Sequence, residues 1–189
     1  MIKSNSTVPL LTLWYKPGQT LQGLIAVGAG HTGAVVITAL FGLVQAWRLH
    51  IAGDESGSLV LVAGMAVALL GLFLYGWLIR NFGRWLGSES RPADVRTALG
   101  WGLLPWLVLF AGLSLLMAQS GDVAQLATVY PFFFVAFVYG YIILLLALSA
   151  ALRISVLKTF LCLVVTCLVS IFPITFIAQL VFGLSVPNP

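Results

Sequence analysis

The sequence predicts an all-α membrane protein, a bundle of five transmembrane helices with a cytoplasmic N-terminus and an external C-terminus. Hydrophobic residues make up 61% of the 189 positions and charged residues only 7%, whereas soluble domains carry about 25% charged residues. The charges also fall in clusters. The charge-free stretches between them are residues 17–47, 56–79, 97–121, 123–152 and 159–189, each longer than the roughly 20 apolar residues that cross a bilayer.

The distribution of Lys and Arg predicts the orientation. Eight of the nine fall on one side of the spans, namely Lys3, Lys16, Arg80, Arg84, Arg91, Arg96, Arg153 and Lys158. Arg48 is alone on the other side. Because short loops rich in Lys and Arg stay in the cytoplasm, the N-terminus is expected inside and the C-terminus outside, in the cell inner (plasma) membrane.

The five spans are expected at residues 24–46, 58–79, 98–118, 126–149 and 160–182. They leave loops too short for a folded soluble module, so residues 1–189 are expected to form one membrane-embedded domain. The chain has no series of ten-residue segments with alternating hydrophobicity, which excludes a transmembrane barrel.

The segment before the first span is typical of a membrane interface. Trp14 and Tyr15 precede Lys16, and Pro17 suits the first turn of a helix. Aromatic rings beside a lysine favour the depth of the lipid headgroups. The first helix is therefore expected to start at this interface and to continue into the span.

His31 lies inside the first span, and no span contains an acidic residue that would pair with it. An ionisable side chain at membrane depth is a functional candidate, here for a proton relay or a ligand site. The alternative is a neutral imidazole hydrogen-bonded to a neighbouring helix, which Ala29 and Gly33 would allow to approach closely.

The second span ends in Trp77, Arg80 and Arg84, spaced i, i+3 and i+7. This spacing predicts one stripe of arginines with their guanidinium groups at the interface. After the loop, Pro92 and Asp94 predict that the third helix begins before the membrane, because proline suits a first turn and an acid complements the helix dipole.

The same loop contributes Arg91 and Arg96 beside Arg80 and Arg84. Four basic residues near one membrane face suggest a patch that binds anionic headgroups or an acidic partner, each contributing on the order of 1 kcal/mol. The alternative is that the four arginines only determine topology.

Three spans contain a proline, at Pro105, Pro131 and Pro173. A proline lacks the backbone donor that the helix needs and bends it, so three kinks would either shape a cavity or serve packing alone. Pro105 is expected to break the bond to the Trp101 carbonyl, well inside a helix that starts near Pro92.

The last two spans suggest packing rather than chemistry. The aromatic run from Tyr130 to Tyr141 is too dense for one helix face, so part of it is expected to contact lipid. Cys162 and Cys167 are five residues apart on one helix, on different faces, which excludes a disulfide between them.

Motifs for enzymatic chemistry are missing from the sequence. It contains no Walker loop, HEXXH, GxSxG or CxxC. His50, Asp54 and Glu55 are clustered outside the first span and offer metal-ligand atoms, but no second His or Cys completes a site, so solvated loop polarity is the preferred interpretation.

Two blocks of the sequence resemble a known family. The first is WYKPGQTL, with Trp14, Pro17 and Thr20, and the second is RWLGSESRPADVRTALGWGLLPW. Both resemble the bacterial branch of the Yip domain family (Ypt-interacting proteins), whose members similarly open with an aromatic residue and Pro-x-x-Thr before the first span. Their second loop reads aromatic-Leu-Gly, small polar residues, Arg and Ala, followed by a proline in the third span, and is matched here by Trp85, Leu86, Gly87, Ser88, Arg96, Ala98 and Pro105.

The resemblance covers essentially the whole chain. It implies the family's five-span layout and a membrane-organising or adaptor role. The acidic, glycine-proline signature of the eukaryotic members is absent, so binding of Rab-type GTPases is not carried over to this chain.

We interpret the chain as a non-enzymatic inner-membrane protein that acts as a membrane organiser or adaptor through lipid or protein contacts. The expected partners are membrane lipids, anionic on the cytoplasmic face, and membrane proteins or further copies of the chain. No cofactor, metal or nucleic acid is expected. The alternative is a small transporter, channel or lipid-translocating protein with a cavity around His31 and the proline-kinked helices.

The topology is tested with reporter fusions. Fusions after Val123 and at Pro189 should both report an external location, and a fusion after Ser88 should report the cytoplasm, because of the bias in Lys and Arg. A cytoplasmic signal at Pro189 would require an even number of spans and would overturn the predicted architecture.

Overall fold

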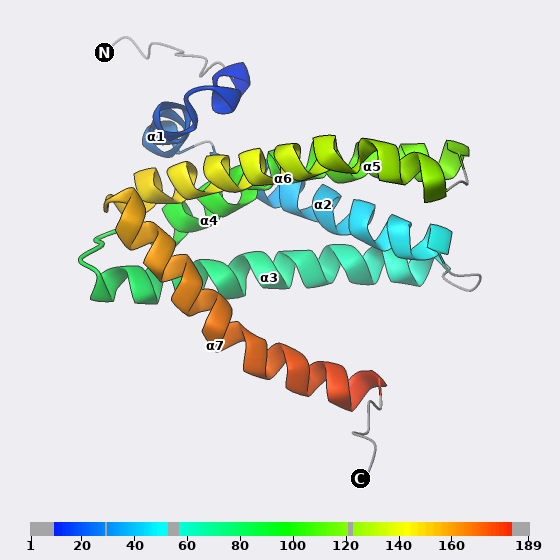
Figure 1. The fold of residues 1–189 in the computed structure, drawn as a ribbon. Helices are drawn as coiled ribbons and strands as arrows, with labels where there is room; N and C mark the ends of the chain where they lie inside the picture. The colour runs from blue at the N-terminus through cyan, green and yellow to red at the C-terminus, as the bar shows by residue number, and fades with distance from the viewer. Residues whose placement is uncertain (1–9, 29, 53–56, 121–122, 183–189) are drawn as a thin grey trace.

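The computed structural model describes residues 10–28, 30–52, 57–120 and 123–182 (Figure 1). These residues form helices, and no strand occurs among them. In chain order the elements are a 3-10 helix η1 (Leu10–Trp14), α1 (Pro17–Val27), α2 (Gly30–Ala52), α3 (Ser58–Trp85), α4 (Pro92–Gly102), α5 (Leu104–Ser120), α6 (Val123–Leu152) and α7 (Val156–Phe182). The all-α prediction is confirmed.

Five segments are long and apolar enough to cross a membrane, as the sequence predicts. They are Gly30–Arg48, Ser58–Trp85, Pro92–Ala118, Thr128–Leu152 and Val156–Pro173. Their side chains are mostly exposed to the outside of the bundle, as expected of helices whose solvent is lipid. Which end of the bundle faces the cytoplasm stays a prediction.

The long helices α2, α3, α5 and α6 run alongside one another (Figure 1). α7 packs against α3 and α6, and its distal half diverges from the other helices (Figure 1). The α3–α4 and α6–α7 connections lie at the same end of the bundle as α1 (Figure 1).

α1 is a separate short helix, so the expectation that one helix runs from Pro17 into the first span is wrong. Pro17 does occupy the first turn of α1. α1 ends at Gly28, whose φ of +69° is the left-handed conformation that glycine adopts easily, and α2 begins at Gly30. The first span consequently starts at Gly30 and not at residue 24. Figure 1 shows α1 nearly end-on, across the end of the bundle.

The third span is also divided. α4 ends at Gly102 and α5 begins at Leu104, and the Leu103 amide donates to the carbonyls of Leu99 at 3.1 Å and Gly100 at 3.2 Å. Pro105 has no amide hydrogen for the Trp101 carbonyl, so an interruption occurs where the sequence predicts it. Pro105 is, however, a first-turn residue of a new helix rather than a kink within one. Pro131 and Pro173 lie within α6 and α7, which continue through them.

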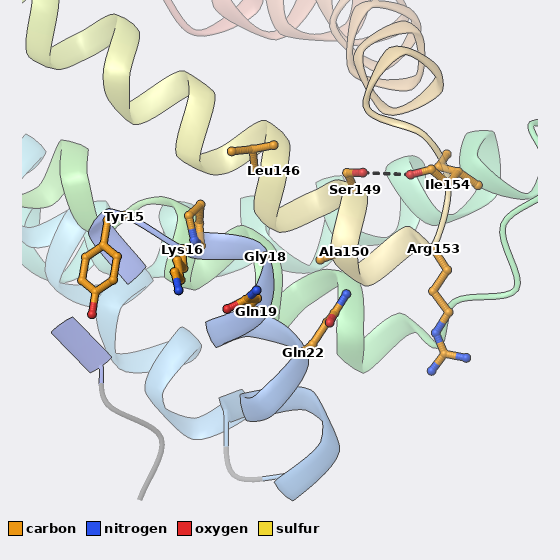
Figure 2. Close-up of a pocket in the computed structure, with 11 residues that line it drawn as sticks. Tyr15, Lys16, Gly18, Gln19, Gln22, Leu146, Ser149, Ala150, Arg153 and Ile154 are labelled. Carbon is orange, nitrogen blue, oxygen red and sulfur yellow. Dashed lines mark hydrogen bonds between the residues drawn. The ribbon is translucent and has the colours of Figure 1, made fainter. Parts of the chain in front are cut away.

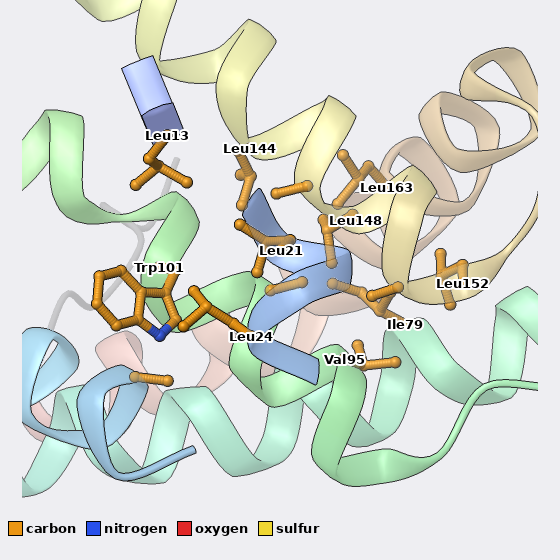
Figure 3. Close-up of a cluster of buried hydrophobic side chains, with 14 of the residues drawn as sticks. Leu13, Leu21, Leu24, Ile79, Val95, Trp101, Leu144, Leu148, Leu152 and Leu163 are labelled. Atoms are coloured by element: carbon orange, nitrogen blue, oxygen red, sulfur yellow. The ribbon is translucent and has the colours of Figure 1, made fainter. Parts of the chain in front are cut away.

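The buried core lies at the α1 end of the bundle (Figure 3). Leu21 and Leu24 of α1 pack with Val95 of α4 and Leu148 of α6. Because each contributing helix supplies only a few apolar side chains, α1 closes a core that the spans alone would leave open. The Trp101 ring lies in this cluster, and its Nε1 donates to the Gly30 carbonyl at 2.9 Å.

Small residues bring the helix backbones together. A Cβ added at Gly42 would lie 2.4 Å from the Gly64 carbonyl oxygen, and one at Gly64 would lie 2.5 Å from the Ala46 Cβ. Gly100 and Ala34 form the equivalent contact between α4 and α2, where an added Cβ would lie 2.5 Å from the Ala34 Cβ. In lipid, where apolar burial drives helix association weakly, such close approach is a main source of packing energy.

Aromatic and cysteine residues lie where the sequence places them. Tyr130, Phe132 and Phe134 of the aromatic run are exposed on α6, as expected of the part of the run that does not pack within the bundle. Cys162 is buried with its thiol donating to the Ile79 carbonyl at 3.2 Å, Cys167 is exposed, and both are free.

Gly64→Ala should destabilise the bundle by about 1–3 kcal/mol, because the new methyl group would overlap the α2 backbone. Gly112→Ala is the matched control, since a Cβ there meets no atom within 4 Å and alanine is the better helix former. Denaturant unfolding in mixed micelles measures the free energy of unfolding of both variants. Equal stability of the two variants would show that the α2–α3 contact is not tightly packed.

Candidate lipid-contact site

Seven described Lys and Arg side chains belong to one end of the bundle, called here the basic end. They are Lys16, Arg80, Arg84, Arg91, Arg96, Arg153 and Lys158. They come from the residue before α1, the end of α3, the start of α4, the α6–α7 connection and the first turn of α7. Among the Lys and Arg residues that the structure describes, Arg48 in the last turns of α2 lies at the opposite end.

The α3–α4 connection forms a fixed junction rather than a free loop. Gly87 has a φ of +95°, which glycine adopts without strain, and the Ser88 amide donates to the Gly83 carbonyl at 2.9 Å. The Ser88 side chain is buried, and its Oγ donates to the Leu152 carbonyl at the end of α6 at 2.7 Å. Lys158 Nζ donates to the Leu86 carbonyl at 3.3 Å. The junction is therefore attached to both α6 and α7.

Arg80 and Arg84 line a hollow of about 440 Å³ at this junction. Its other walls are Gly87, Ser88, Glu89 and Ser90. Arg80 Nε donates to the Ser90 carbonyl at 3.3 Å, which fixes one guanidinium at the wall. Two guanidinium groups suit a phosphate or carboxylate, with the exposed Glu89 as the one opposing charge among the lining residues.

A second hollow, of about 630 Å³, adjoins the first along α3. It is lined by Trp77, Asn81 and Arg84, with the exposed Trp85 at its rim. Trp77 and Arg84 thus share a helix face, as their i, i+7 spacing predicts. Exposed indole rings next to a guanidinium are typical of the lipid headgroup region.

The predicted patch of four arginines is not continuous. Arg91 is exposed immediately before α4 and is not among the residues that line the hollow. Arg96 lies against Gly76 of α3, and its Cζ is 4.7 Å from the centre of the Phe73 ring. Phe73 lies one turn farther from the basic end than Gly76, so Arg96 extends into the span instead of toward the interface. Its Nε is buried without a hydrogen-bond partner in the described part of the chain.

A third hollow, which sequence reasoning missed, lies between α1 and the end of α6 (Figure 2). Its volume is about 580 Å³, and Lys16, Gln19, Gln22 and Arg153 contribute polar groups to its wall. Figure 2 shows Lys16 just before α1 and Gln19 and Gln22 along it, with Arg153 just after the end of α6. Residues 16 and 153 are far apart in sequence, and only the packing of α1 across the bundle brings them together. The i, i+3, i+6 spacing of the α1 residues was the available signal.

Several positions of the two sequence blocks have structural roles. Thr20 is buried, and its Oγ1 is 2.5 Å from Thr12 Oγ1 and donates to the Lys16 carbonyl at 3.1 Å. The Trp14 carbonyl accepts a hydrogen bond from the Tyr139 hydroxyl of α6. These contacts hold η1 and α1 together and against the bundle.

His31 occupies the first turn of α2, near the basic end rather than the middle of the membrane. Its Nδ1 is buried without a hydrogen-bond partner among the described residues, so the expected bond from this atom to a neighbouring helix is not found. Gly33 does provide the close approach, with an added Cβ 2.6 Å from the Trp101 ring. The hollows at the basic end are lined by other residues, so they do not supply the cavity around His31 that a transporter requires.

The other candidates concern the opposite end. Asp54 and Glu55 lie outside the described residues, as does the side chain of His50. Within the described ranges, no group of three His, Cys, Asp or Glu residues is arranged to hold a metal ion.

Comparison with known proteins adds one match. A family model, the Yip1 domain, matches residues 11–177, which include all but the first residue of η1, all five spans and the α3–α4 junction. No curated protein and no solved structure matches the chain.

Ser88→Ala should destabilise the protein by about 1–3 kcal/mol, because the buried carbonyl of Leu152 would lose its donor. Ser58→Ala, at an exposed helix start, removes a hydroxyl without such a bond and serves as the control. Thermal unfolding in detergent measures the difference. A melting temperature of the Ser88 variant equal to that of the control would mean that the junction is not anchored through this bond.

Proposed function

Because the chain belongs to the Yip1 domain family of multi-pass membrane proteins, we propose that it is a non-enzymatic membrane organiser or adaptor that binds anionic lipid headgroups at its basic end. The proposed location is the inner (plasma) membrane, with the basic end in the cytoplasmic leaflet. Protein partners would use the same end, where the connections between helices are presented.

The observation that carries the proposal is the hollow at the α3–α4 junction. Arg80 and Arg84 lie on adjacent turns of α3. The hydrogen bond from Arg80 to the Ser90 carbonyl holds the Arg80 guanidinium in place before a ligand arrives. Preorganised charge reduces the entropy that binding costs. The dimensions of the hollow, about 440 Å³, suit a single headgroup.

The surroundings support a lipid rather than a soluble anion. Trp77 and Trp85 are exposed on the same part of α3, where their rings would lie among headgroups while the arginines face the phosphates. Lys16 and Arg153 contribute positive charge to the separate hollow between α1 and α6 at the same basic end. A membrane surface presents many headgroups at once, which such separate sites would use together.

Arg84→Gln should reduce retention of phosphatidylglycerol on the purified protein about fivefold, the effect of losing one basic contact worth roughly 1 kcal/mol. Arg91→Gln is the matched control, since it removes the same charge from an exposed residue at the same end but outside the hollow. Lipid mass spectrometry after exchange into mixed phosphatidylglycerol and phosphatidylcholine micelles provides the measurement.

Two outcomes would contradict the proposal. An equal loss in both variants would show a general field of the basic end rather than a site. Unchanged retention in both would leave these arginines as topology determinants only.

A further inference from the structure

Arg48 lies at the end of the bundle opposite the basic end and is held in an unusual way. Its side chain is partly buried, and its Cζ is 4.9 Å from the centre of the Phe110 ring of α5. Nη1 donates to Gln45 Oε1 at 3.2 Å, while Nε is buried without a hydrogen-bond partner among the described residues. A buried guanidinium nitrogen with an unused donor carries a desolvation cost, which falls on this one atom of the partly buried side chain.

A cavity of about 550 Å³ opens beside this guanidinium. It lies between α5 and α6, and apart from Arg48 its lining is apolar or aromatic, with Phe110 and Leu113 on α5 and Tyr130 and Phe133 on α6. The volume falls within the usual range of small-molecule sites, which combine apolar walls with a few polar groups that fix orientation. One cation at an aromatic cavity specifies a ligand with an apolar body and an anionic head.

The depth of the site indicates which anionic amphiphile fits. Helical side chains point toward the start of their helix, so Arg48 reaches back along α2 toward the bilayer. It meets Phe110, which is ten residues before the end of α5 and therefore about 15 Å along the helix from that end. The same ring packs 6.0 Å from Phe41, an interior residue of α2. The charged head must consequently enter below the level of the helix ends.

We infer that this cavity binds a long-chain fatty acid, with the carboxylate at Arg48 and the hydrocarbon chain between α5 and α6. A carboxylate carries a single charge and two acceptor oxygens, which match the planar fork of one guanidinium. A phospholipid phosphate is tied to its glycerol at the interface, whereas a free carboxylate is able to follow its chain inward. This site is independent of the headgroup contacts at the basic end.

The test uses the full-length protein in phosphatidylcholine nanodiscs, with oleate as the probe and oleyl alcohol as its uncharged counterpart. Arg48→Gln should weaken oleate binding about tenfold or more, as the loss of a charge-assisted hydrogen bond does, and should leave oleyl alcohol unaffected. Arg48→Lys keeps the charge without the planar fork, so its affinity for oleate should lie between those of the wild type and Arg48→Gln.

A second pair of variants tests the cavity itself. Leu113→Trp should fill the space and reduce binding of both probes, whereas Val108→Trp, exposed on the same helix away from the cavity, should not. Circular dichroism and size-exclusion chromatography of each variant establish that the bundle is folded. Equal affinity of wild type and Arg48→Gln for oleate would overturn the inference. Displacement of oleate by equimolar phosphatidylglycerol would do so as well, because it would assign the site to a phospholipid.

Discussion

The fold depends on the requirement that every backbone polar group inside a bilayer finds a partner within the protein, because hydrocarbon offers none. Unbroken helices meet this requirement by themselves, but this chain interrupts its helices several times. Where the chain passes between helices, side-chain donors reach backbone carbonyls of neighbouring segments. Trp101 Nε1 donates to the Gly30 carbonyl at the start of α2, Ser88 Oγ to the Leu152 carbonyl at the end of α6, and Ser149 Oγ to the Ile154 carbonyl beyond it. Ser88 and Ser149 also line two of the hollows of the basic end, so these bonds lie beside the candidate sites.

The number and approximate positions of the spans could be predicted because length and the absence of charge identify membrane helices with little help from tertiary structure. The residues at which helices begin and end were harder to predict from the sequence. Gly28 and Pro105 are both visible in the sequence, but whether a glycine or proline bends a helix or ends it depends on what packs around it. Here α1 turns across the bundle because Leu21 and Leu24 are buried against α4 and α6. A hydropathy profile does not contain information about that tertiary contact.

The candidate site shows the same limit more strongly. Sequence proximity grouped Arg80, Arg84, Arg91 and Arg96, yet only the first two share a hollow. The direction of a long side chain is decided by its neighbours: Gly76 leaves room for Arg96 to lie against α3, and Phe73 then contacts the guanidinium. Lys16 and Arg153 line the same hollow because of the position of α1, which no local pattern encodes. Charge clustering therefore predicted which residues share one end of the molecule and left the arrangement of that end undetermined.

Arg96 has an electrical consequence. A positive charge that lies part of the way across the hydrocarbon region experiences part of the transmembrane voltage, and a full crossing corresponds to about 2.3 kcal/mol per 100 mV. The position of this guanidinium therefore has an energy that varies with the state of the membrane, unlike that of Arg84 or Arg91 at the surface. Its contact with Phe73 is weak, of the order of 1–2 kcal/mol for a cation over an aromatic ring away from water. A displacement over part of the hydrocarbon thickness corresponds to only a fraction of the voltage energy, so the potential acts on the position of Arg96 as a small bias added to this contact.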